Sequence, residues 1–168
     1  LLSFEAGEGH GSTVNVFSGS GMQKMPEDLT FYAHFRNADN WIPAGFAIAG
    51  EDQTVIYRPG AELEVTEDTV FVAVYADPYQ LWVGSTKVTP DNQNDVLGDG
   101  KVSYDPYTYT LHLDDPGPIP GVTRGNLIYG VDMPLTVTGT ANFSEDTGNF
   151  SEYIYVMNGS VTLDGEFI

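Results

Sequence analysis

The chain has 168 residues, of which 24 are acidic and 6 are basic, so its formal net charge is −18. Such a charge repels polyanions and excludes nucleic-acid binding and attraction to anionic membrane surfaces. There is no cysteine, which rules out disulfide scaffolds, thiolate zinc sites and cysteine nucleophiles. Apolar residues make up 41% of the chain, enough to build packed cores rather than a disordered polymer.

The two ends of the chain both have the alternating pattern of a strand. Leu1–Phe4 opens the chain and Gly165–Ile168 closes it, with no initiating Met and no signal-peptide pattern. No run approaches the roughly 20 apolar residues of a membrane span, so no membrane insertion is expected of this fragment. We expect the chain to be a piece of a longer protein, with targeting and anchoring segments outside it.

Short strands and turns are predicted throughout, because there are 19 Gly, 10 Pro and no long helical pattern. In the first 76 residues, strands are predicted at 2–6 and 14–17, on either side of the glycine-dense turn 7–11. Four more strands are predicted from their apolar runs, at 43–49, 54–58, 62–65 and 69–76.

The segment from Met25 to Phe35 has two alternatives. Pro26 and the acidic residues after it favour a helical turn, with Leu29, Phe31 and Phe35, and Tyr32 as a further candidate, packing inward. The run 29–35 also fits a strand. The sequence leaves the structure of residues 22–43 open between them.

The first module resembles the internalin B-repeat family. The likeness is carried by Phe4-Glu5-Ala6-Gly7-Glu8-Gly9, Ala44-Gly45-Phe46, Tyr57-Arg58-Pro59-Gly60-Ala61, Val65-Thr66-Glu67-Asp68-Thr69 and Val72-Ala73-Val74-Tyr75. Phe46 and Tyr75 stand where Trp is usual, and residues 27–43 depart from the family pattern. The resemblance implies a small β-grasp-like fold, used as a repeated spacer or adhesive unit on bacterial surfaces.

A joint is predicted at Asp77-Pro78, since proline fixes its own backbone angle and restricts the residue before it. The sequence therefore divides into a module at 1–77 and a second at 78–168. The second module contains an internal repeat with an offset of twenty-six residues. At this offset 125–129 aligns with 151–155, and 135–139 aligns with 161–165, including a closing glycine in each copy. A repeat of this kind predicts stacked coils, each covering the one before; chance similarity of short β patterns is the alternative.

The segment before the repeat resembles the opening of a bacterial secreted module often labelled carbohydrate-binding. The likeness is carried by Leu81-Trp82-Val83-Gly84, Val88-Thr89, Asp95-Val96-Leu97-Gly98-Asp99-Gly100, Val102-Ser103-Tyr104-Asp105-Pro106 and Thr110-Leu111-His112-Leu113. The resemblance implies the N-terminal cap and first rungs of a right-handed parallel β-helix. The whole chain is thus expected to be mainly β, with a small β-grasp-like domain followed by an incomplete β-helix.

No metal site is predicted from the histidines. His10, His34 and His112 lie outside any metal-binding spacing, and His112 is expected on the polar face of a strand. Calcium is a separate alternative, because Asp91–Asp95 followed by Gly98-Asp99-Gly100 offers oxygen ligands. Both segments are also ordinary turn formers, and they lack the glycine and glutamate of an EF-hand loop.

No catalytic residue is predicted, and the chain is not expected to be an enzyme. There is no nucleophile elbow and no base beside a serine, and Arg124 is the only cation between Lys101 and the end. The acidic pairs Asp114-Asp115 and Glu145-Asp146 are expected to lie solvated in turns. A polysaccharide-degrading enzyme would need an acid cluster assembled only in the folded chain.

Four tyrosines are the candidate ligand-binding residues. Tyr107 and Tyr109 follow the turn at Asp105-Pro106, where both rings are expected to be exposed. Tyr129 and Tyr155 share the repeat offset and are expected to stack on adjacent coils. Exposed rings can pack against sugars, although a tyrosine ladder also stabilises strands without any ligand.

We therefore expect a non-catalytic segment of a secreted or cell-wall-attached bacterial surface protein that serves adhesion or display. Its partners would be a host or matrix surface protein, or a polysaccharide. The alternative is a carbohydrate-binding module that uses one β-helix face, with calcium as a conceivable aid. Because the last strand would leave an open edge, we expect either further protein downstream or a dimer across that end.

Overall fold

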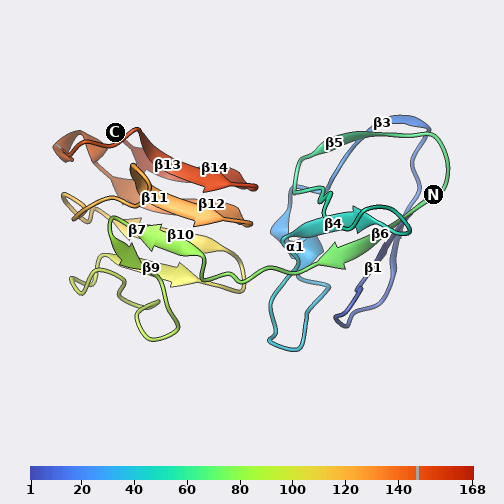
Figure 1. The fold of residues 1–168 in the computed structure, drawn as a ribbon, viewed down its shortest axis with the longest axis horizontal. Helices are drawn as coiled ribbons and strands as arrows, with labels where there is room; N and C mark the ends of the chain where they lie inside the picture. Colours follow the sequence, from blue (N-terminus) through green and yellow to red (C-terminus); the bar gives the residue numbers. More distant parts are fainter. Residues whose placement is uncertain (147) are drawn as a thin grey trace. The chain divides into compact units, whose positions relative to one another are not determined.

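The computed structural model describes residues 1–146 and 148–168 and is mainly β, with 43% of the chain in strands and 4% in helix. It divides into two compact units, Leu1–Ala76 and Asp77–Ile168, which are described separately (Figure 1). Among the described residues, no helix has the length and apolar character needed to cross a membrane.

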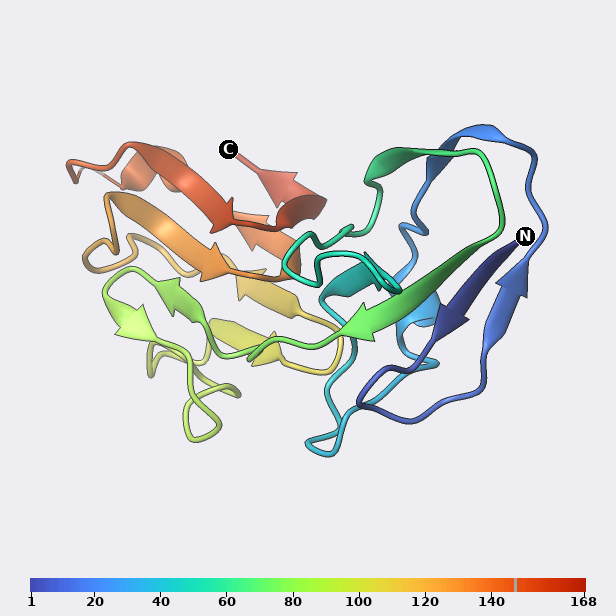
Figure 2. The same ribbon diagram turned by 45° about the vertical axis from the view of Figure 1, so that its right-hand side comes forward.

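The first unit is built on a four-stranded mixed sheet in the order β2-β1-β6-β4. Its strands are β1 (Leu2–Glu5), β2 (Val14–Val16), β4 (Gly45–Ile48) and β6 (Thr69–Val74). β1 and β6 are parallel and lie side by side (Figure 2), while β2 and β4 pair antiparallel at the edges. A separate antiparallel pair is formed by β3 (Gly21–Lys24) and β5 (Glu62–Val65).

Aromatic side chains fill the core of the first unit. Phe4 is almost fully buried, and its ring centroid lies 4.9 Å from Phe31, 5.1 Å from Phe46 and 5.0 Å from Phe71. Edge-to-face and offset contacts of this kind add to the free energy gained by burying the rings. The alternation of β1 and β6 thus turns one face of each strand onto a common aromatic cluster.

The segment after Met25 forms a helical turn, which settles the two sequence alternatives. α1 (Leu29–Tyr32) is capped by Asp28, whose side chain accepts a hydrogen bond of 2.9 Å from the Thr30 backbone N–H. This bond satisfies one of the free amides at the helix start. Tyr32 and Phe35 are fully buried, so the turn delivers aromatic groups to the core.

The prediction of a strand at 54–58 is wrong. The Asp52 carboxylate accepts hydrogen bonds from both the backbone and the hydroxyl of Thr54, which closes a turn where the strand was expected. Only Tyr57 pairs with a strand, through an isolated bridge to Phe46. The other predicted strands of this unit are present, with β6 ending at Val74.

The second unit contains two four-stranded sheets. One has the order β13-β11-β7-β8, and the other has the order β14-β12-β10-β9. The strands of the first sheet are β7 (Leu81–Val83), β8 (Thr86–Lys87), β11 (Asn126–Val131) and β13 (Glu152–Met157). Those of the second are β9 (Val102–Asp105), β10 (Thr110–Asp114), β12 (Pro134–Ala141) and β14 (Ser160–Phe167). A 3₁₀ turn, η1 (Phe143–Glu145), lies between β12 and β13.

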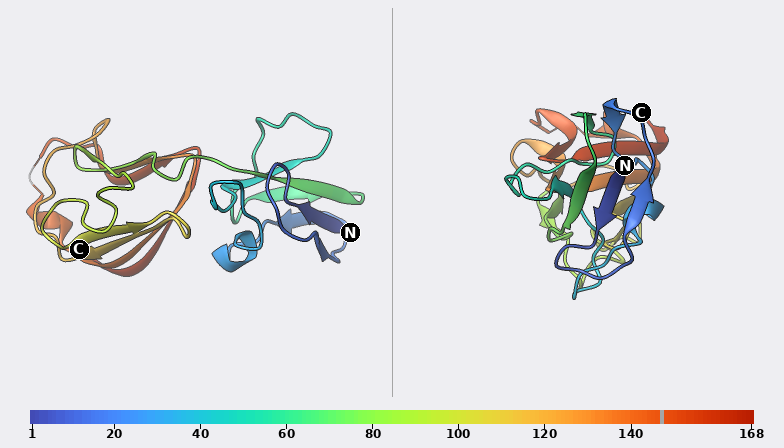
Figure 3. Two further views of the ribbon diagram at one scale, coloured as in Figure 1. Left: turned by 90° about the horizontal axis from the view of Figure 1, so that it is seen from below. Right: turned by 90° about the vertical axis from the view of Figure 1, so that its right-hand side faces the viewer.

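The predicted twenty-six-residue repeat is confirmed as a strand register. β11 pairs in parallel with β13, placing Tyr129 beside Tyr155, and β12 pairs in parallel with β14, placing Leu135 beside Val161. β10 also pairs in parallel with β12 at the same offset, which adds a third strand to that column and which the sequence repeat did not reveal. Viewed from below, the strands of this unit overlie one another (Figure 3, left).

The connection between the two sheets also recurs at this offset. Asp132, between β11 and β12, and Asn158, between β13 and β14, adopt left-handed backbone angles with φ of 55° and 54°. The Asp132 N–H donates to the Met157 carbonyl at 2.9 Å, so adjacent coils are also hydrogen-bonded through their turns. Asp and Asn tolerate this conformation better than most residues, which explains their use here.

Opposite the parallel coils, antiparallel strands complete each sheet. β7 pairs with β11 and carries β8 at its outer edge, while β9 pairs with β10. The core of this unit includes four fully buried side chains on β10 and β12: Leu111, Leu113, Leu135 and Val137. Antiparallel pairing changes the chain direction, so β7, β8 and β9 do not continue the twenty-six-residue stack.

The recurrent glycines allow the closest approach between coils. A Cβ built on Gly139 would clash with the Leu113 backbone carbonyl oxygen, and one built on Gly165 would clash with the Gly139 carbonyl oxygen. Gly139 also has a φ of +94°, a backbone angle that residues with a side chain rarely adopt. The repeated glycine in the sequence is therefore explained by backbone contact.

We predict that Gly139→Ala destabilises the second unit by more than about 2 kcal/mol, because strain and a backbone clash add together. Gly98→Ala is the matched control, since Gly98 also has a positive φ of +78° but has no atom within 4 Å of a built Cβ. Its cost should be about 1 kcal/mol. Urea unfolding followed by Trp82 fluorescence in a Trp41→Phe background measures both, and equal costs would contradict the close-contact explanation.

Candidate functional site

The four candidate tyrosines have different environments. Tyr107 and Tyr155 are exposed, at 46% and 42% of their surface, whereas Tyr109 is fully buried and Tyr129 is 3% exposed. The expectation that both Tyr107 and Tyr109 are exposed therefore fails for Tyr109, whose backbone turns at a φ of 52° and carries the ring into the interior. As they stand, only the rings of Tyr107 and Tyr155 offer substantial surface to a ligand.

Tyr129 and Tyr155 do stack, as the repeat predicted. Their ring centroids are 6.2 Å apart with an interplanar angle of 19°, and Trp82 lies 5.8 Å from Tyr129 on the other side. Two cationic side chains lie over rings of the aromatic column formed by Trp82, Tyr129 and Tyr155. Lys87 Nζ is 5.5 Å from the centroid of the Trp82 ring, and the Arg124 guanidinium is 5.9 Å from that of the Tyr129 ring. At these distances each contact has the geometry of a cation–π interaction.

An apolar groove at the last coil was not anticipated from the sequence. It has a volume of about 610 Å³ and lies between β13, η1 and β14, where Phe143, Tyr153, Ile154, Leu163 and Phe167 line it. Tyr153 is 46% exposed and its ring stacks 5.4 Å from that of Phe143. No motif in the sequence marks this groove, because its lining comes from three separate elements.

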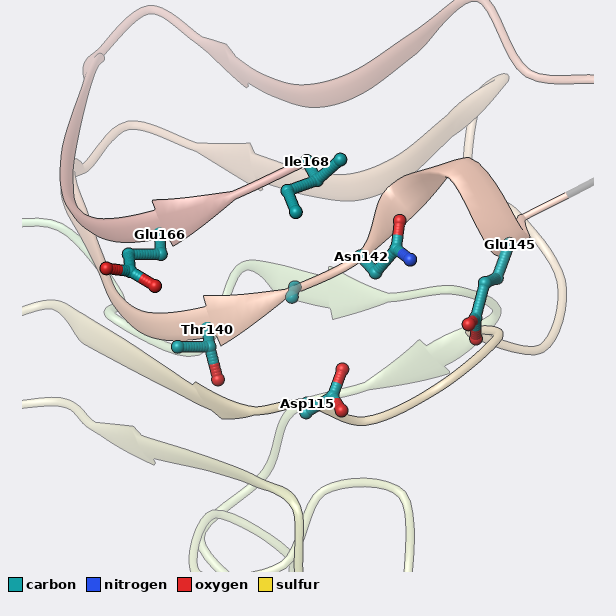
Figure 4. Close-up of a pocket in the computed structure, with 7 residues that line it drawn as sticks. Asp115, Thr140, Asn142, Glu145, Glu166 and Ile168 are labelled. Atoms are coloured by element: carbon teal, nitrogen blue, oxygen red, sulfur yellow. The ribbon is translucent and has the colours of Figure 1, made fainter.

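A second, acidic groove of about 310 Å³ is shown in Figure 4. Asp115, Glu145 and Glu166 bring three carboxylates to it from separate elements, beside Thr140 and Asn142. Nevertheless, in residues 1–146 and 148–168 no group of three or more His, Asp or Glu side chains is arranged to hold a metal ion. The Asn142 side chain is engaged by the Ser144 backbone amide and hydroxyl, capping η1.

The segment considered for calcium uses its oxygen atoms to hold its own turns. Asn92 Oδ1 accepts from the Thr89 N–H at 2.7 Å, Asp95 Oδ1 from the Gly100 N–H at 2.9 Å, and Asp99 Oδ1 from the Lys101 N–H at 2.9 Å. These are the local side-chain bonds that Asn and Asp make in loops. Each of these three residues thus stabilises a turn of its own loop.

The histidines are exposed and separate. His112 lies on the polar face of β10, as expected, and its Nδ1 is 3.0 Å from the Thr138 hydroxyl on the neighbouring coil. His10 lies in an isolated backbone bridge with Arg36, and His34 follows α1. No catalytic pairing of a histidine with a serine is present among the described hydrogen bonds.

Asp146 departs from the expectation that the acidic pairs are solvated. Its Oδ1 accepts a hydrogen bond of 2.7 Å from the Ile119 N–H, while its Oδ2 is buried without a hydrogen-bond partner. Burial raises the pKa of this carboxyl above its ordinary 3.8, and the Ile119 bond partly opposes the rise. The other three acids of these pairs are exposed, as expected.

Comparison of the chain with protein-family models, with curated proteins and with solved structures finds no match. The chain is therefore characterised by its own architecture, a mainly β protein whose second unit stacks strands at a constant register. Function is argued from that architecture and from the surfaces just described.

We predict that Asp146→Asn stabilises the second unit at neutral pH. A carboxyl with a raised folded pKa contributes its full stability below the unfolded pKa, near 3.8, and loses it as the pH rises through the folded value. An amide keeps the bond from Ile119 and removes the ionisation cost. The gain should therefore be present at pH 7 and vanish below pH 4.

Asp164→Asn is the control for this change, because Asp164 is an exposed carboxylate on β14 and its replacement alters the net charge equally. Thermal unfolding from pH 3 to pH 8 compares the two variants. A stabilisation of equal size in both would show that relief of overall charge repulsion, rather than burial of Asp146, is responsible.

Proposed function

We propose that the chain is a non-catalytic segment of a secreted or wall-attached bacterial surface protein that serves adhesion or display. In this proposal the first unit is a β-grasp-like repeat, and the second is the cap and first coils of a right-handed parallel β-helix. The single observation that carries it is the constant register of β10, β12 and β14, and of β11 and β13.

The topology of each unit supports this reading. In the first, the parallel pair β1 and β6 lies at the centre of a mixed sheet whose core receives α1 and the aromatic residues after it. In the second, three parallel strands of one sheet and two of the other present the same positions to their neighbours, as stacked coils of a solenoid do. The antiparallel strands at the start of the second unit correspond to the proposed cap.

The composition of the interior supports a scaffold rather than an enzyme. Among the described residues, Asn126 is the one polar side chain in the buried set, and its Nδ2 donates to the Arg124 carbonyl at 3.0 Å. Acid–base catalysis usually relies on titratable groups whose pKa is tuned by burial beside a partner. Apart from Asn126 the buried set is aliphatic and aromatic, and Asp146, whose pKa is raised by burial, has its hydrogen bond with a backbone N–H and not with another titratable group.

The outer positions of the second sheet support display. Three columns of side chains follow the register: Thr110, Thr136 and Thr162; His112, Thr138 and Asp164; Asp114, Thr140 and Glu166. A ladder of hydroxyl and carboxylate groups gives a regular, hydrated surface that does not aggregate. Such a surface suits a segment held outside a cell.

A second candidate function, carbohydrate binding, is favoured by the exposed ring of Tyr155 at the end of the aromatic column. This ring is backed by Tyr129 and so presents a preformed planar surface of the kind that packs against sugars. The exposed ring of Tyr107 is a separate position for such a contact. Calcium would belong to this alternative and not to the scaffold proposal.

The two functions are separated by measuring saturable binding of the purified chain to immobilised extracellular-matrix proteins, to host cells and to a glycan array, with and without a chelator. For adhesion we expect saturable binding to protein or cell surfaces that the chelator leaves unchanged. Failure to bind any of these surfaces would contradict a direct adhesive role.

Selective retention on glycans would instead support the second candidate. In that case Tyr155→Ala should weaken retention at least tenfold, while Phe17→Ala, which removes an exposed ring in the first unit, serves as the control. Release of reducing ends from pectin or a similar polymer would contradict both candidates, because it would show catalysis.

A further inference from the structure

Strand β2 is an uncovered edge of the sheet in the first unit. It pairs with β1 on one side only, in the order β2-β1-β6-β4, and it lies at the outer border of that sheet (Figure 2). The chain reaches β2 from β1 and continues from it to β3, so this edge is formed by an internal segment. An edge strand has backbone N–H and C=O groups that can pair with another strand.

The backbone groups at the centre of this edge belong to Asn15. The Thr69 N–H on β6 donates to the Leu1 carbonyl at 3.0 Å, and backbone groups alternate in direction along a strand. The backbone groups of Leu2 are therefore directed toward β2, where its register partner is Val16. Asn15 precedes Val16, so its N–H and C=O are directed away from β1, and no loop of the described residues hydrogen-bonds to them.

Other sheet edges are covered by the chain itself. At β4 the Phe46 N–H donates to the Tyr57 carbonyl at 2.9 Å, and the Tyr57 N–H donates to the Phe46 carbonyl at 2.7 Å. At β9 the Tyr104 N–H donates to the Gln93 carbonyl at 2.7 Å. Within the part of the chain that the structure describes, β2 has no cover of this kind.

The segment around β2 also lacks charge, in a chain with a formal net charge of −18. The fifteen residues from Gly9 to Gln23 contain no Asp, Glu, Lys or Arg, and His10 is the one titratable side chain among them. Over most of the surface, the approach of a second copy brings carboxylates together and is opposed by repulsion. At β2 two copies meet along neutral residues.

Exposed apolar side chains accompany this neutral edge. Phe17 is 88% exposed, Met22 is 64% exposed and Val16 is 38% exposed. Val16 lies on the same face of the sheet as its register partner Leu2, which is buried in the core. A strand added beside β2 therefore extends the core face and removes apolar surface from water.

We propose that β2 is a self-association edge, at which the β2 strands of two copies of this chain pair antiparallel about a two-fold axis at Asn15. The two Asn15 residues then exchange N–H···O=C bonds as a hydrogen-bonded pair. Val14 lies opposite Val16 of the second copy, and Phe17 lies opposite Thr13 of the second copy. The contact is self-complementary, and it joins two four-stranded sheets into one without burying a charge.

The short edge makes this association weak. β2 has three residues, too few to reach the area of about 1,200 Å² at which stable interfaces begin. Because the contact is neutral while the rest of each chain repels the other, added salt screens the repulsion and strengthens the dimer. A contact built from ion pairs would show the opposite salt dependence.

The test measures the dissociation constant of the full chain by sedimentation equilibrium at low and high salt, up to millimolar concentration. Phe17→Asp places a carboxylate at the proposed contact, and the ring that it removes is almost wholly exposed, so the fold is not disturbed. Val55→Asp is the matched control, because it replaces another exposed apolar side chain of the first unit by the same charge. Amide hydrogen exchange at Asn15 is followed over the same concentrations.

We expect a dimer that tightens with salt, is weakened at least tenfold by Phe17→Asp, and changes less than twofold with Val55→Asp. Exchange of the Asn15 amide should slow as the dimer forms. A chain that stays monomeric throughout, a dimer that Phe17→Asp leaves intact, or a dimer in which the Asn15 amide is not protected would each overturn the proposal. None of these readouts involves a ligand, so the result is independent of the adhesion and glycan measurements.

Discussion

Backbone hydrogen bonds between strands twenty-six residues apart hold the second unit in one arrangement. They align β10, β12 and β14, and separately β11 and β13, so that each column repeats one kind of side chain. A slip of one residue would turn every apolar side chain outward, because side chains alternate across a strand. The burial of Leu111 and Val137, the stacking of Tyr129 on Tyr155 and the threonine ladder all depend on this register.

Close backbone contact makes the register specific. Gly139 and Gly165 follow one another in a column where the carbonyl of the strand below occupies the place of a Cβ. On β12 and β14 a side chain at this position would meet the backbone of the neighbouring strand, so an alignment that moved a larger residue into it would be opposed by a steric clash. Apolar burial favours stacking in general, and the glycines select one alignment among the alternatives.

The features that were predicted correctly from the sequence are those that depend on local residue patterns. It predicted most strands, the turn-forming role of Asp and Gly, and the pairing of Tyr129 with Tyr155, because period-two alternation and a repeat offset are visible in one dimension. It did not predict that β10 joins the stack, since the aligned side chains of Leu111 and Val137 are alike only in being aliphatic. The strand expected at 54–58 is absent because the Asp52 carboxylate accepts a hydrogen bond from the Thr54 N–H, and the turn so formed competes with strand pairing.

The candidate sites were less predictable, because they depend on burial. Tyr107 and Tyr109 are two residues apart and chemically identical, yet one is exposed and the other is fully buried. Asp146 differs from its neighbour Glu145 in having a buried Oδ2 and in accepting a hydrogen bond at Oδ1 from Ile119, which is far away in the sequence. The apolar groove at β13 and β14 likewise combines side chains of η1, β13 and β14, which only the folded chain brings together.

Cysteine cross-linking tests the register most directly, since the chain contains no cysteine of its own. Thr136→Cys combined with Thr162→Cys joins register partners on β12 and β14. Neighbouring strands lie about 4.8 Å apart, within the range that a disulfide spans. Thr136→Cys combined with Asp164→Cys is displaced by two residues, to roughly 8 Å, beyond that range. The register predicts rapid oxidation of the first pair and little of the second, while preferential oxidation of the displaced pair would contradict it.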